Sequence, residues 1–102
     1  MSIHVTIQYK VLADQVEENE KAVSKFLEGI RKAADAEAKY TSYKLPDGVS
    51  FMHTGWFANA NAKARFQAAD HFKEFAAGLP GRCEIKPSVT PLSLIASTEN
   101  FG

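Results

Sequence analysis

The chain has 102 residues, a length that suits one domain with a small core. Its 12 basic and 12 acidic side chains cancel, which argues against nucleic-acid binding because phosphate contacts need clustered positive charge. No apolar run approaches the roughly 18 residues of a membrane-spanning helix, so we expect no membrane association. The one cysteine, Cys83, cannot form an intrachain disulfide, and a reduced, partly buried thiol is typical of a cytoplasmic protein. We therefore expect a single cytoplasmic domain over residues 1–102, of which 97–102 form a tail.

The first predicted elements are a strand and a long helix. Apolar and polar side chains alternate from Ile3 to Val11, which is the period of a strand with one apolar face. A helix from about Gln15 to Asp35 follows, because apolar residues recur along one stripe of a helical projection. Asp14, with Glu17 three residues later, is expected to cap its N-terminus.

A hairpin is predicted next. The run from Lys39 to Leu45 has the β-branched and aromatic composition of a strand, and an alternating run from Val49 to Phe57 forms its partner. Pro46-Asp47-Gly48 between them favours a turn, because proline presets φ and glycine accepts a positive φ.

A second helical region begins after the hairpin, with Asn59 or Asn61 as its N-cap. A single straight helix would bury Arg65 within its apolar stripe. We therefore expect a break near Ala69-Asp70, with Asp70 capping a second short helix that starts at His71.

The last predicted strand, from Glu84 to Ala96, follows the helix-ending pair Pro80-Gly81. It contains Pro87 and Pro91, which have no N–H group to donate to a neighbouring strand. This strand is therefore expected at an edge of the sheet or to be bulged.

The order of elements predicts an α+β fold, namely the ferredoxin-like βαββαβ arrangement with an antiparallel sheet and helices on one face. In the register that we expect, the helix-facing side carries Val5, Ile7, Tyr9, Tyr43, Phe51 and His53. The opposite side carries His4, Thr6, Gln8, Tyr40, Met52, Thr54 and Trp56. This second set is too aromatic for a fully solvated face, and it predicts sheet-on-sheet packing with another subunit.

Three stretches carry a resemblance: the opening strand VTIQYKV, Gly55-Trp56 at the end of a strand, and the segment FQAADHFKEFAAGL with its His71-Phe72 pair. On these features the chain, from Ile3 to about Ala96, resembles the antibiotic biosynthesis monooxygenase-like domain of the dimeric α+β barrel superfamily. The resemblance implies a homodimer whose two sheets pack into a barrel. It also implies a relationship to cofactor-free monooxygenases of quinols and polyketide phenols, although haem-degrading enzymes and an isomerase share the domain.

Two histidines are the candidate catalytic residues. His71 follows the predicted helix break, where a neutral imidazole beside Phe72 can accept a proton from a phenolic hydroxyl or orient it. Its alternative role is local capping or a surface contact. His53 lies in the middle of a strand near Tyr43, where it can form the polar end of a pocket or a satisfied pair in the core.

Four aromatic residues, Tyr43, Phe51, Trp56 and Phe72, are the candidate substrate-binding residues, although packing is the commoner role of aromatics in a small core. A metal site is not expected, because His4, His53, His71 and Cys83 fall in four separate elements. We expect no cofactor.

The sequence leaves three functional hypotheses open. The first is a homodimeric, cofactor-independent monooxygenase in which His71 or His53 deprotonates a small aromatic such as a quinol, and the anion reacts with O2. The second is a non-catalytic homodimer that binds a small apolar ligand. The third is a dimeric domain with a filled interior and no pocket.

Overall fold

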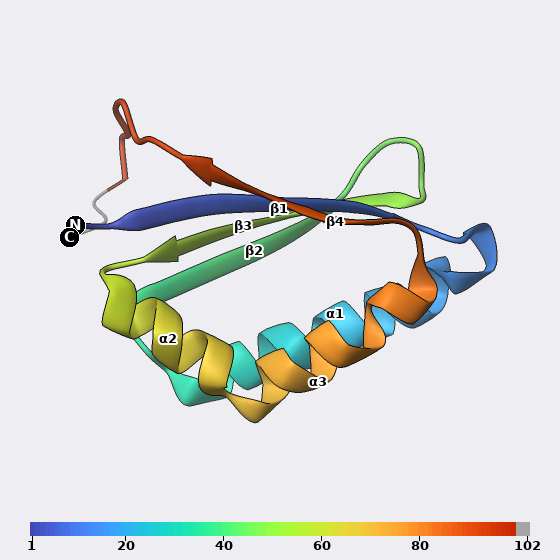
Figure 1. The fold of residues 1–102 in the computed structure, drawn as a ribbon, viewed down its shortest axis with the longest axis horizontal. Helices are drawn as coiled ribbons and strands as arrows, with labels where there is room; N and C mark the ends of the chain where they lie inside the picture. Colours follow the sequence, from blue (N-terminus) through green and yellow to red (C-terminus); the bar gives the residue numbers. More distant parts are fainter. Residues whose placement is uncertain (100–102) are drawn as a thin grey trace.

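The computed structural model describes residues 1–99, which form a four-stranded antiparallel sheet with three α-helices on one face (Figure 1). In chain order the elements are β1 (Ile3–Val11), α1 (Val16–Ala33), β2 (Ala38–Lys44), β3 (Ser50–Phe57), α2 (Ala60–Ala68), α3 (Asp70–Gly78) and β4 (Cys83–Leu92). Short 3-10 helices at Ala13–Gln15 and Pro80–Arg82 precede α1 and β4. The predicted α+β, ferredoxin-like fold is confirmed, with its second helix divided into α2 and α3.

The strands lie in the order β2-β3-β1-β4. The central strand β1 pairs with β3 without interruption, whereas its pairing with β4 shifts register on either side of Lys10. The last strand is therefore both at an edge and irregular, as its prolines predict. It ends at Leu92, and residues 93–99 form no helix or strand; residues 100–102 of the predicted tail lie outside the described residues.

The helix boundaries confirm the predicted break and one of the predicted caps. The Asn59 side chain accepts a hydrogen bond from the backbone N–H of Ala62 at 2.8 Å, which caps α2. The break after Ala68 places Arg65 on the surface, where it pairs with Asp35 and Glu37.

Two other capping predictions were wrong. Asp14 lies within the 3-10 helix before α1, and α1 has no side-chain cap at its N-terminus. Asp70 is already the first residue of α3, whose N-cap is Ala69, so the carboxylate does not cap the helix.

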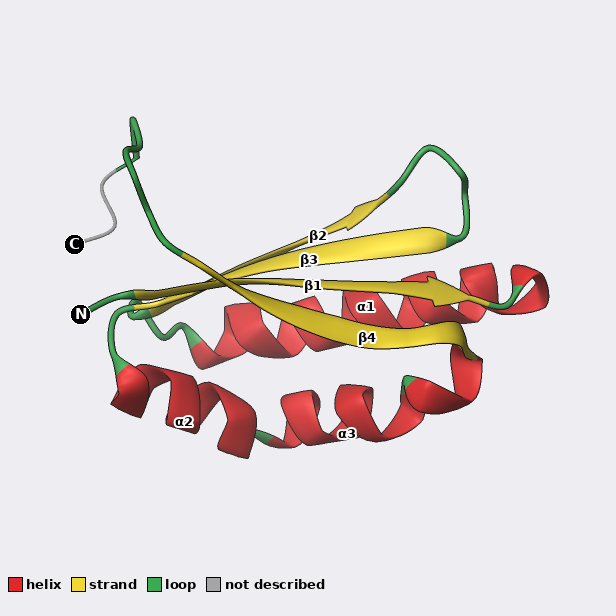
Figure 2. Ribbon diagram, turned by 45° about the horizontal axis from the view of Figure 1, so that its top comes forward, coloured by secondary structure: helices red, strands yellow, loops and turns green. Residues whose placement is uncertain are grey.

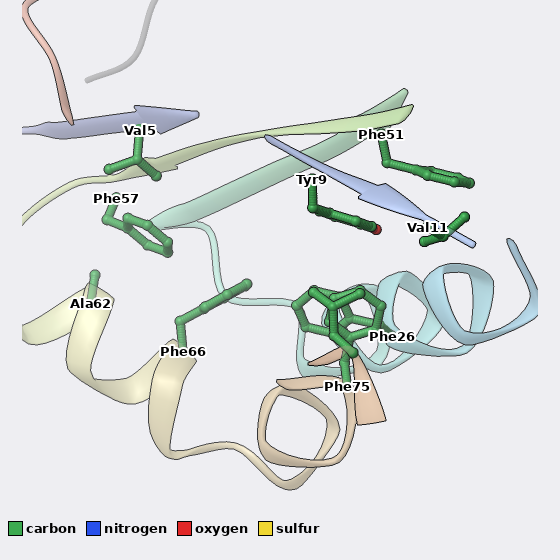
Figure 3. Packing of buried hydrophobic residues seen from close by; sticks show 10 residues of the cluster. Val5, Tyr9, Val11, Phe26, Phe51, Phe57, Ala62, Phe66 and Phe75 are labelled. Atoms are coloured by element: carbon green, nitrogen blue, oxygen red, sulfur yellow. The ribbon is translucent and has the colours of Figure 1, made fainter. Parts of the chain in front are cut away.

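The core lies between the sheet and the helices and consists largely of aromatic rings (Figure 3). Phe26 of α1 stacks on Phe75 of α3 with ring centroids 4.7 Å apart, and it meets Phe66 of α2 edge to face at 5.8 Å. These contacts join all three helices. None of the helices in residues 1–99 is long and apolar enough to cross a membrane.

The predicted register of β2 was wrong by one residue. Tyr40 pairs with Gly55 and faces the helices, whereas Tyr43 pairs with Met52 on the opposite face. Gly55 lies against the Tyr40 ring, and a Cβ there would lie 3.3 Å from the ring, which is a tighter contact than most Cβ atoms make. The two tyrosines are three residues apart, so they cannot both project from the same face.

Candidate functional site

A cavity of about 240 Å³ lies between the sheet and the helices. Its walls are formed mainly by aromatic and aliphatic side chains, namely Val5, Ile7, Phe26, Phe57, Phe66, Phe72, Phe75 and Leu79. Exposed lining residues on α2 and β4, among them Gln67, Pro87 and Val89, mark its opening between these two elements, which lie apart in Figure 2. A cavity of about 150 Å³ holds one benzene ring, so this one is large enough for a small bicyclic aromatic.

The polar end of the cavity is a group of three side chains from the three strands β1, β2 and β3. The Tyr9 hydroxyl lies 2.8 Å from Nε2 of His53, and the Tyr40 hydroxyl lies 3.0 Å from its Nδ1. Both ring nitrogens of His53 therefore have a hydrogen-bond partner, as a side chain that is only 1% exposed requires. A ligand in the cavity would meet hydroxyl and imidazole groups at one end and hydrocarbon elsewhere.

This group is continued by two further side chains toward the surface. Asn19 of α1, which is fully buried, donates through Nδ2 to the Tyr9 hydroxyl at 2.9 Å. Arg82 donates through Nε to Oδ1 of Asn19 at 3.0 Å, and its guanidinium carbon lies 5.7 Å from the centre of the Phe75 ring. Five side chains far apart in the sequence thus form one connected network.

Burial keeps the histidine and the two tyrosines of this network uncharged. It lowers the pKa of His53 to about 4, because an imidazolium would lose its hydration in the core. Burial also raises the pKa of Tyr9 to about 12, although the hydrogen bond from Asn19 acts in the opposite direction, and it raises the pKa of Tyr40. At neutral pH the polar end of the cavity consists of a neutral imidazole and two neutral phenols.

Solved structures with the same arrangement of elements identify the fold. The crystal structure of an antibiotic biosynthesis monooxygenase superposes with a TM-score of 0.81 at 11% sequence identity, covering 92% of this chain and 99% of that one. SnoaB, a cofactor-independent oxygenase from Streptomyces nogalater, superposes with a TM-score of 0.75 at 13% identity, covering 97% and 98%. This chain has an antibiotic biosynthesis monooxygenase-like fold.

The Rv0793 protein from Mycobacterium tuberculosis is also similar, with a TM-score of 0.84 at 13% identity over 97% of this chain and 100% of that one. No family model and no curated protein matches the sequence. The likeness therefore rests on the backbone arrangement of the antibiotic biosynthesis monooxygenase-like fold.

Two of the six site residues predicted from the sequence line the cavity of this fold. His53 forms its polar end and Phe72 part of its wall. His71 instead lies in a second hollow between α1 and α3, where it packs so closely on Gly29 that a Cβ there would lie 2.6 Å from the histidine Cβ. The two candidate catalytic histidines are thus in different hollows.

The other three predicted residues lie outside the cavity. Phe51 stacks on the Tyr9 ring with centroids 5.5 Å apart and so supports the polar group from behind. Trp56 and Tyr43 lie on the face of the sheet opposite the helices, where Tyr43 is 51% exposed and the Lys39 ammonium lies 5.4 Å from the centre of the Trp56 ring. The tyrosines that contact His53 are Tyr9 and Tyr40, not Tyr43.

Sequence reasoning missed Tyr9, Tyr40 and Asn19 as members of the site. One signal was available, because Asn19 follows Val16 by three residues and precedes Val23 by four, which places it on the apolar stripe of α1. A polar side chain on such a stripe needs a buried partner. Among residues 1–99, no three His, Cys, Asp or Glu side chains are grouped closely enough to hold a metal ion.

Proposed function

We propose that this protein is a cofactor-independent monooxygenase that acts on a small aromatic quinol or phenol bound between the sheet and the helices. The observation that carries the proposal is the apolar cavity of about 240 Å³ with one uncharged polar end. A planar ring can fill the apolar part while one of its oxygen substituents meets Tyr40 and His53. The cofactor-independent oxygenase among the similar structures supports the same class of reaction.

The proposed reaction uses electrons from the substrate itself. An electron-rich quinol loses a proton to the solvent and binds as its anion, which reacts with O2 without flavin or metal. For 1,4-dihydroxynaphthalene, one oxygen atom enters a ring C–H position, the other leaves as water, and the product is a hydroxynaphthoquinone. Both hydrogens of the water come from the substrate, so the atoms and electrons balance.

The cavity residues have three proposed roles in this reaction. Phe72 and Phe66 hold the ring and exclude water, which favours the reaction of the anion with O2. Tyr40, which is oriented by its hydrogen bond with His53, binds the substrate oxygen that becomes charged. We assign His71 a packing role, because it lies in the separate hollow between α1 and α3.

The direct test is O2 consumption with a panel of dihydroxynaphthalenes, with no added flavin or metal and with the protein-free autoxidation rate subtracted. We expect turnover that falls at least tenfold in Phe72→Trp, which fills the cavity, and in His53→Ala. His71→Ala is the matched control and should retain turnover. A protein that is inert across the panel would refute the oxygenase proposal.

A second candidate function is a non-catalytic homodimer that binds a small apolar ligand. The observation that favours it is the engagement of both His53 nitrogens by tyrosines, which leaves neither nitrogen free to take a proton directly. In that case His53→Ala would change the affinity for an aromatic ligand, and no substrate of the panel would be consumed.

We also propose that the protein forms a homodimer through the face of the sheet opposite the helices. That face has no helix over it within the described residues, as Figure 1 shows, and it presents large apolar side chains. Tyr43 and Leu92 are 51% and 46% exposed, and Met52 lies beside Tyr43 in the sheet. A second copy suits this face, because a chain with no net charge is not repelled by its own copy.

A further inference from the structure

The network from Arg82 to Tyr40 has a direction that follows from its chemistry. Arginine can only donate hydrogen bonds, so the Asn19 atom that faces Arg82 must be the amide oxygen. The amide nitrogen of Asn19 then faces Tyr9, and the Tyr9 oxygen is an acceptor. One end of the network is therefore fixed without knowing any hydrogen position.

The next step fixes the tautomer of His53. The Tyr9 hydroxyl is buried, and His53 Nε2 at 2.8 Å is the acceptor available to its single proton among the described residues. If Tyr9 donates to Nε2, the neutral imidazole carries its proton on Nδ1. Nδ1 then donates to the Tyr40 oxygen at 3.0 Å.

Tyr40 is consequently the last donor in a series of hydrogen bonds that all point in the same direction, from Arg82 toward the cavity. Its oxygen accepts from His53, so its own proton is left for the cavity that it lines. Hydrogen bonds aligned in one direction polarise one another, and at the far end stands a guanidinium with no carboxylate within ion-pairing distance in residues 1–99. Its Nη2 is buried and has no hydrogen-bond partner among those residues, which leaves its positive charge poorly compensated within the protein.

We propose that Tyr40 donates a hydrogen bond to an oxygen acceptor on the bound ligand, a carbonyl or an aryloxide, and that Asn19 and Arg82 are positioning residues that set this direction. The inference deepens the proposed function, because an aryloxide is the form of a quinol that reacts with O2, but it concerns binding and does not require turnover. It names the ligand class as flat aromatics that present an oxygen acceptor, and it disfavours ligands whose only polar group is a donor.

The first arm of the test measures binding by calorimetry of two molecules with the same ring skeleton, 1-tetralone and tetralin, which differ by one carbonyl. We expect 1-tetralone to bind about tenfold more tightly, the factor that one well-aligned hydrogen bond supplies. Tyr40→Phe should abolish this ratio while tetralin still binds. Arg82→Met should lower the ratio of the two affinities, although Arg82 does not contact the ligand. If Arg82 had a purely structural role, the substitution would weaken the binding of both molecules equally.

Lys63→Met is the matched control, because Lys63 is a cation that lines the same cavity but lies outside the network. The ratio of the affinities for 1-tetralone and tetralin should be the same in Lys63→Met as in the unchanged protein. A ratio that depends on Lys63 and not on Arg82, or equal affinities for the two molecules, would overturn the inference and leave the oxygenase proposal standing.

The second arm uses the nitrogen NMR spectrum of His53 in the unliganded protein at neutral pH. We expect the proton on Nδ1 and a bare Nε2; the opposite tautomer would overturn the direction of the network whatever binds. If neither 1-tetralone nor tetralin binds, the ligand assignment fails, whereas the oxygenase proposal is decided by the O2-consumption panel; the tautomer still decides the direction of the network.

Discussion

Within residues 1–99, His53 and Asn19 are the two polar residues that are buried in the core, at 1% and 0% exposure. Each is tolerated because its hydrogen-bonding atoms are engaged, His53 by two tyrosines and Asn19 by Tyr9 and Arg82. Removing one member leaves the others unsatisfied in the core, and the loss of a partner costs more than the bond contributed. Substitutions in the network should therefore affect folding as well as the proposed ligand binding.

Acid should destabilise the protein through His53. The pKa of His53 is lowered to about 4 by burial, whereas the unfolded histidine titrates near about 6.5. Between these values the unfolded chain binds a proton that the folded chain does not, so stability is complete above about pH 6.5 and is lost as the pH falls toward 4. We expect the free energy of unfolding in urea to fall by about 2 kcal/mol from pH 7 to pH 5.

His53→Gln should flatten this dependence. Hydrogen bonds from Arg65 to Asp35 and from Ser50 to Asp47 hold the pKa values of these two aspartates below their usual range. Protonation of the two aspartates therefore reduces stability only at a lower pH. A variant that loses as much stability as the unchanged protein between pH 7 and pH 5 would show that another group is responsible.

Removal of the Tyr9 hydroxyl should be costly. Tyr9→Phe leaves Nδ2 of Asn19 and Nε2 of His53 without their partner in the core, and we expect a loss of about 1–3 kcal/mol in the free energy of unfolding. The matched control is Tyr43→Phe on the exposed face, which should change stability by less than about 0.5 kcal/mol. Chemical denaturation of both variants decides the point, and equal effects would contradict a buried network.

At the scale of elements, α1 and α3 approach each other where His71 lies on Gly29. A side chain at position 29 would meet the Cβ and Cγ of His71 at 2.6 Å, closer than van der Waals contact allows. Gly29 lies in the interior of α1 rather than at its end. The close contact with His71, and not a helix terminus, is therefore the reason for a glycine at this position. His71, which the sequence predicts to be catalytic, contacts Gly29 at this helix crossing.

Gly29→Ala should therefore destabilise the protein. On an open helix surface this change stabilises by about 1 kcal/mol, but here the two helices must move apart, and we expect a net loss of about 1–3 kcal/mol. Adding His71→Ala to the same chain should restore only part of the loss in urea denaturation, because alanine removes the ring but keeps the Cβ that lies 2.6 Å from the new side chain. A single Gly29→Ala variant that is more stable than the unchanged protein would contradict this packing.

The strands and helices were predictable because their periods are strong, as in β1, where one residue of slip would expose every apolar side chain. Strand β2 lacks such a pattern, since its polar residues occupy both faces and Tyr40 and Tyr43 compete for one of them. The sequence therefore indicated that His53 has a tyrosine partner but selected the wrong tyrosine. The network itself joins residues from five separate parts of the chain, and no local pattern encodes such a meeting.

Within residues 1–99, the helices lie on one side of the sheet, and residues 93–99 lie on the other side (Figure 1). The open face carries Tyr43, Leu92 and Ile85, which are about half exposed or more. This asymmetry underlies the proposed homodimer.

Sedimentation at micromolar concentration should give a species of about twice the 11.2 kDa chain mass. Leu92→Lys combined with Ile85→Lys places two charges on the open face and should yield single chains with an unchanged circular dichroism spectrum. Leu12→Lys, at an exposed apolar position outside the sheet, is the control and should leave the mass unchanged. A chain that sediments only at 11.2 kDa before any substitution would refute the dimer.

The two prolines of β4 have a consequence for how copies of the chain can assemble. A free sheet edge is a template on which another chain can add a strand, and repeated addition yields open-ended fibrils. Pro87 and Pro91 remove two backbone donors from this edge strand, and its shifted register bends the remainder. Edge-to-edge growth through β4 is thereby disfavoured, which is consistent with the closed homodimer proposed above rather than an open-ended assembly.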